Sequence, residues 1–147
     1  MDSELYYIYT STFLVIILLL FSLKQKLNYF DKCYSYSGII ITIFFILSLL
    51  FELKIFILTC HVSLVIFIMI LSFIIENKII IITNLTVITM IVVSWMLYNE
   101  CPISKYEDIT VAEYLLPHIR ALRILISIVF IYLLFKLCKP IIKKYIK

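Results

Sequence analysis

Long apolar runs, some separated by only three residues, dominate this sequence of 147 residues and limit what it can fold into. A helix rises 1.5 Å per residue, so about 20 apolar residues cross the roughly 30 Å hydrocarbon core of a bilayer. Hydrophobic residues make up 65% of the chain and charged residues 15%, whereas soluble proteins are about half apolar and a quarter charged. The sequence therefore predicts an integral membrane protein.

We expect an all-α integral membrane bundle of about five transmembrane helices, forming a single domain over residues 1–147. The predicted spans end where charged residues interrupt the apolar runs, and they cover residues 5–23, 37–51, 55–75, 79–98 and 117–138. The last span has an uncharged core of only 124–135, with basic residues near both ends. Long basic side chains can reach the interfaces, but four spans plus an interfacial helix is the alternative.

Glu52-Leu53-Lys54 is the only break between the second and third predicted spans. Burying both charges in one continuous helix would cost several kcal/mol, so the break predicts a tight turn and an antiparallel hairpin. A single bent helix is the competing interpretation. The chain has one glycine, so we expect its helices to pack through bulky side chains and hydroxyls rather than through small residues.

Residues 99–123 form the longest polar interruption of the chain. Ser104 with Glu107, and Thr110 with Glu113, fit the capping-box pattern, in which a hydroxyl and a carboxylate bond to the first free N–H groups of a helix. We therefore expect a folded cap over these residues, and we interpret it as the surface that faces a partner.

The distribution of basic residues predicts the orientation, because cytoplasmic loops carry an excess of Lys and Arg. With five spans, four of the 13 Lys and Arg fall on the side of the N-terminus and of the polar cap. The other nine fall on the side of the C-terminus: Lys24, Lys26, Lys32, Lys78, Lys136, Lys139, Lys143, Lys144 and Lys147. We expect the N-terminus outside and the C-terminus in the cytoplasm or its equivalent.

His61 and Cys60 lie within the third predicted span, and an ionisable residue at that depth is a functional candidate. His61 could stay neutral and bond to another span, or it could belong to a proton or ion path. Ligation of a metal or haem is a third interpretation, but it needs several converging donors. The candidate hydrogen-bond partners are Asn84, Thr86, Thr89 and Thr42.

Arg120 and Arg123 lie three residues apart on one helical face. Paired guanidinium groups suit a phosphate headgroup or an acidic partner, but the two arginines could instead pair with carboxylates of the cap, Glu107 among them. Cys101 is a candidate external thiol. The four cysteines contain no CxxC and fall in different layers, with Cys33 and Cys138 as the only pair that could meet, so no disulfide framework is expected.

Residues 95–107 carry Trp95, a short gap, Cys101-Pro102-Ile103-Ser104 and, after two residues, Glu107. This string resembles a loop of a family of small multi-span membrane proteins of unknown function, found in bacteria and with similar members in large DNA viruses. Cys101, Pro102 and Glu107 match that loop, whereas a histidine that often adjoins the Trp is Ser94 here. The resemblance implies a few antiparallel spans and no particular activity.

The sequence shows no catalytic, cofactor-binding or metal-ligating signature, so we expect neither an enzyme nor a bound cofactor. We interpret the chain as a structural or protein-interaction component of a membrane, with a viral or organellar membrane as one setting. Its expected partners are the lipid bilayer and a membrane protein or a second copy, and not nucleic acid. The alternative is a small subunit of a transport or proton-translocating assembly that uses His61.

Overall fold

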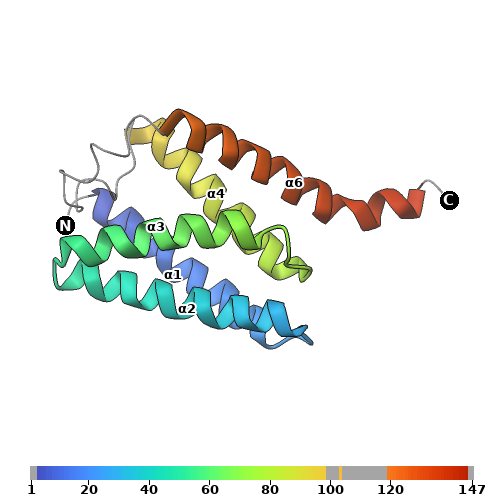
Figure 1. Cartoon of the computed structure of the whole chain (residues 1–147), viewed down its shortest axis with the longest axis horizontal. Helices are drawn as coiled ribbons and strands as arrows, with labels where there is room; N and C mark the ends of the chain where they lie inside the picture. Colours follow the sequence, from blue (N-terminus) through green and yellow to red (C-terminus); the bar gives the residue numbers. More distant parts are fainter. Residues whose placement is uncertain (1–2, 99–102, 104–118, 146–147) are drawn as a thin grey trace.

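The computed structural model describes residues 3–98, 103 and 119–145, and every regular element in these ranges is a helix (Figure 1). This confirms the predicted all-α bundle. The helices are α1 (Ser3–Leu23), α2 (Tyr29–Leu50), α3 (Lys54–Leu71), α4 (Lys78–Tyr98) and α6 (Ile119–Tyr145).

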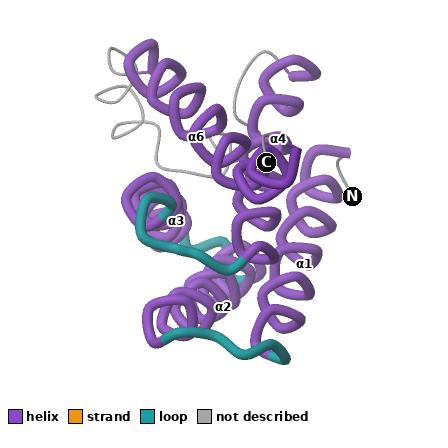
Figure 2. Tube along the Cα trace, turned by 90° about the vertical axis from the view of Figure 1, so that its right-hand side faces the viewer, coloured by secondary structure: helices purple, strands orange, loops and turns teal. Residues whose placement is uncertain are grey.

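The first four helices form an antiparallel bundle, and α6 lies against one side of it. Helix α2 packs against α1 and α3, and α1 also packs against α4. Helix α6 mainly contacts α4, with a smaller contact to α3, and its C-terminal end extends beyond the bundle in Figure 1. Figure 2 shows α2 and α6 on opposite sides of the molecule.

Four helices, α1 to α4, are long and apolar enough to cross a membrane. The chain is therefore a multi-pass membrane protein. Among the described residues, α6 is not counted with these four helices. Its role as a fifth span and the alternative of an interfacial helix both stay predictions.

The predicted bounds hold for α1 and α4 but are wrong at three other helix ends. Helix α2 begins at Tyr29 instead of residue 37, because Asn28 caps it by accepting a hydrogen bond from the Asp31 backbone N–H at 2.7 Å. Helix α3 ends at Leu71 instead of residue 75, since the chain turns toward α4. Helix α6 extends past residue 138 to Tyr145, through Pro140.

The predicted hairpin between the second and third spans is confirmed. Residues 51–53 connect α2 to α3, and the Leu53 backbone N–H donates to the Ser48 carbonyl at 2.9 Å. Glu52 lies in the left-handed region, with φ of 53°, which reverses the chain without a glycine. A single bent helix through this turn is excluded.

Two groups of buried apolar side chains hold the bundle together. The larger, which we call the main cluster, joins α1, α2, α3, α4 and α6 and includes Ile80, Ile88 and Val129. The smaller lies where α2 turns into α3. This end cluster, against which Ile103 also packs, consists of Ile8, Phe45, Leu49 and Ile57.

Gly38, the one glycine of the chain, lies where three helices come close together. A Cβ atom at this position would lie 2.9 Å from Leu19 Cδ1 on α1 and 3.5 Å from Phe67 Cε1 on α3. The expectation of packing without small residues is therefore wrong here, since the missing side chain lets α1 and α3 approach α2.

Candidate functional site

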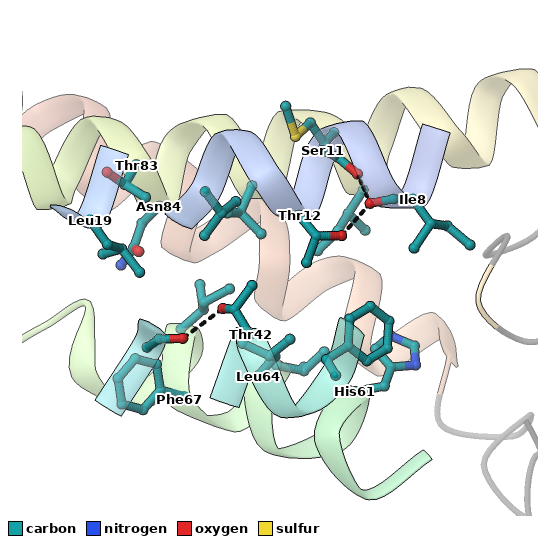
Figure 3. Close-up of a pocket in the computed structure, with 18 of the residues that line it drawn as sticks. Ile8, Ser11, Thr12, Leu19, Thr42, His61, Leu64, Phe67, Thr83 and Asn84 are labelled. Carbon is teal, nitrogen blue, oxygen red and sulfur yellow. Dashed lines mark hydrogen bonds between the residues drawn. The ribbon is translucent and has the colours of Figure 1, made fainter. Parts of the chain in front are cut away.

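A cavity of about 130 Å³ lies among α1, α2, α3 and α4 (Figure 3). Each of these helices contributes to its lining, and Ile103 adds one side chain from the connection that follows α4. The walls are predominantly apolar, although His61, Asn84 and several hydroxyls are among the lining residues. The cavity thus brings together two of the seven residues that the sequence singles out.

His61 is half-buried and lines the cavity from α3. In Figure 3 it lies toward the same end as Ile8 and Thr12, whereas Asn84 lies toward the other end with Thr83 and Leu19. Of its predicted partners, Thr42 and Asn84 share the cavity with it. The other two donate within α4: half-buried Thr86 to the Ile82 carbonyl at 2.9 Å, and exposed Thr89 to the Leu85 carbonyl at 2.8 Å.

Asn84 joins three helices through buried hydrogen bonds. The Tyr34 hydroxyl of α2 donates to Asn84 Oδ1 at 2.5 Å, and Asn84 Nδ2 donates to Ser72 Oγ, directly after α3, at 3.0 Å. The Tyr34 ring stacks on Phe67 with 4.4 Å between centroids. Because these side chains are almost fully buried, their hydrogen bonds satisfy polar groups that lipid could not.

The serine and threonine hydroxyls of the cavity wall donate to the backbone of their own helices. Ser11 donates to the Tyr7 carbonyl at 2.6 Å, Thr42 to the Gly38 carbonyl at 2.6 Å and Thr83 to the Ile79 carbonyl at 2.8 Å. Thr12 bonds in the same way to the Ile8 carbonyl. These hydroxyl protons therefore point to carbonyls, which reduces the polarity that the wall presents to the cavity.

Asp31 lies at the end of the bundle opposite to the end cluster. Its role was not predicted from the sequence. The carboxylate is 2% exposed, and its two oxygens accept the backbone N–H groups of Glu76 and Asn77, each at 3.1 Å. The turn between α3 and α4 is thereby attached to the start of α2. The spacing Asn28-x-x-Asp31, which resembles a helix N-cap signal, could have located the start of α2 but not the distant partners of Asp31.

Lys136 attaches α6 to the same end of the bundle. Its Nζ donates to the Phe73 carbonyl at 3.1 Å and lies 5.5 Å from the centroid of the Tyr132 ring. The Tyr132 and Phe73 rings pack with 4.9 Å between centroids. Asn77 Nδ2 also donates to Gln25 Oε1 at 3.0 Å, so both short loops and the middle of α6 meet at this end.

Cys60 is the one remaining candidate whose side chain the structure describes. Cys60 is half-buried and packs against the end cluster rather than lining the cavity beside His61. Cys101 and Glu107 lie outside the described residues, as does most of the predicted cap. Arg120 and Arg123 fall within α6, but their side chains are not among those described.

Comparison of the chain with protein-family models, curated proteins and solved structures finds no match. The described residues contain no group of three or more His, Cys, Asp or Glu side chains that could hold a metal ion. Within the same part of the chain, every buried side-chain nitrogen and oxygen has a hydrogen-bond partner.

Proposed function

We propose that this multi-pass membrane protein is a structural or protein-interaction component of its membrane, with residues 99–123 facing a partner. The observation that carries the proposal is the packing of Ile103 against the end cluster and into the cavity wall. One apolar residue of the segment 99–123 thus packs against the end of the bundle. We infer that Ile103 fixes the connection between α4 and α6 in a position where the charged residues of that connection contact a partner.

The interior hydrogen bonds support a framework role. Asn84 connects α2 with the α3–α4 hairpin inside the bundle, and Asp31 connects them again at the nearby end. Two separate buried connections restrain how these helices move relative to each other.

Charge reversal tests the partner-facing segment. With Arg120→Glu and Arg123→Glu combined, we expect the purified chain to lose its associated membrane protein or its association with a second, differently tagged copy. The matched control combines Lys24→Glu and Lys26→Glu, which make the same change of charge at the other end of the bundle. His61→Leu should leave association unchanged. Retention of the partner by the arginine variant would contradict the proposal.

A second candidate function is proton or ion transport, and the position of His61 on the cavity favours it. If His61 carries protons, the reconstituted chain should acidify liposomes that contain a pH-sensitive dye, and His61→Leu should abolish the flux. Thr59→Val is the matched control, because Thr59 is an exposed polar residue on the same helix. Flux unaffected by His61→Leu, or no flux at all, would reject this candidate.

The orientation is also a proposal. The loops at residues 24–28 and 72–77 lie at one end of the bundle, together with Lys136. These segments belong to the side with the higher count of basic residues, which supports a cytoplasmic position for that end and an external position for the N-terminus.

A further inference from the structure

We propose that the cavity among α1, α2, α3 and α4 binds one hydrocarbon chain of a membrane lipid. The proposal concerns the interior of the four-helix bundle and does not depend on a protein partner. It rests on the length, the wall chemistry and the closed end of the cavity.

The cavity is long and narrow. On α1 its lining extends from Tyr7 to Leu19, which at 1.5 Å per residue corresponds to about 18 Å along the helix. Its volume of about 130 Å³ resembles that of an apolar cavity of about 150 Å³ that holds one benzene molecule. A volume this small suits one slender hydrocarbon segment and leaves no room for fused rings or a folded headgroup.

The walls suit hydrocarbon rather than a polar ligand. Val15, Leu64, Val65 and Val87 present only carbon atoms, and the Thr42 hydroxyl donates to a backbone carbonyl. A polar group placed against these walls would lose its hydrogen bonds to water without replacement. A hydrocarbon chain loses none, and it gains close contacts with side chains from four helices.

The two ends of the cavity differ, which orients the chain. One end is closed by Tyr34, which is bonded to Asn84 and stacked on Phe67. The other end has His61 and Ile103, where the helices reach the end cluster. The methyl end of the chain therefore lies against Tyr34, and its polar head lies toward the end with His61.

Two kinds of lipid carry such a hydrocarbon chain, a free fatty acid and a phospholipid, and a bilayer contains both. Crosslinking separates the two sources. The full-length chain is purified in detergent and irradiated with a fatty acid that carries a diazirine on its chain, or with a phosphatidylcholine that carries the same group. Mass spectrometry then maps the modified residues.

We expect adducts on cavity residues such as Leu64 and Val65, and competition by unlabelled fatty acid should remove these adducts but not those on exposed positions such as Phe13. Cavity adducts with only one of the two probes identify the source. Adducts confined to exposed side chains, or cavity adducts that resist competition, would overturn the proposal.

A matched pair on α4 tests the same point by mutation. Val87→Phe fills the cavity and should lower the yield of cavity adducts about fivefold or more, whereas Val93→Phe on the exposed face should not. Folding is checked by helicity and by elution as a single species. If Val87→Phe fails to fold, the test uses Val65→Phe in the cavity and Val62→Phe as its exposed control. Equal yields of cavity adducts from the two variants of a pair would overturn the proposal.

Discussion

Replacing Asp31 with asparagine tests the attachment between the α3–α4 turn and the start of α2. Asp31 accepts two backbone N–H groups at 3.1 Å, one on each carboxylate oxygen. Asparagine keeps one acceptor oxygen and presents an NH₂ group to the other N–H, so one hydrogen bond is lost and the remaining one becomes neutral. Hydrogen bonds to charged groups contribute about 1.5–3 kcal/mol each and neutral ones about 1 kcal/mol, so we expect Asp31→Asn to lower the free energy of unfolding by about 2–5 kcal/mol.

Reversible unfolding by sodium dodecyl sulfate in mixed micelles measures this difference. Glu76→Gln is the matched control, because it makes the same chemical change on an exposed side chain of the same turn and keeps the backbone N–H that bonds to Asp31. The control should stay within about 0.5 kcal/mol of the natural chain. Amide exchange at residues 76 and 77 should accelerate only in Asp31→Asn. Equal stability of the two variants would refute the reasoning.

Two further substitutions probe the packing of the bundle. Asn84→Ala removes the acceptor for Tyr34 and the donor to Ser72, and we expect a loss of about 1–3 kcal/mol in the same unfolding assay, against at most about 1 kcal/mol for exposed Thr89→Ala. Gly38→Val brings methyl groups into the contact with Leu19 and should cost about 1–3 kcal/mol, whereas the flexible Leu19 side chain can move enough to reduce the cost of Gly38→Ala.

The spanning helices could be predicted from sequence because apolar runs end where charged residues begin. Helices α1 and α4 agree with the prediction within two residues for this reason. The start of α2 could not be predicted in the same way, since residues 29–36 mix aromatic, polar and charged side chains and resemble a linker. What makes them helical is the local cap by Asn28 together with the burial of Asp31, whose partners lie 45 and 46 residues away.

For the cavity too, features visible within one stretch of sequence could be predicted, whereas contacts between distant residues could not. His61 could be identified as a candidate, because an ionisable residue inside an apolar run is conspicuous in a single sequence. The hydrogen bond between Tyr34 and Asn84 could not be predicted, since Tyr34 lies outside the predicted second span, 37–51. The role of Gly38 depends on the approach of Leu19 and Phe67 from two other helices, which no pattern within α2 reveals.

The sidedness of two loops tests the central claim, that α1 to α4 cross a membrane as antiparallel helices. Single cysteines are introduced by Glu52→Cys or Glu76→Cys into a chain without its natural cysteines, and sealed vesicles are treated with a membrane-impermeant maleimide. Both positions are exposed, and they lie in turns at opposite ends of α3. We predict that one position is labelled in intact vesicles and the other only after permeabilisation. Labelling of both from the same side would contradict the account.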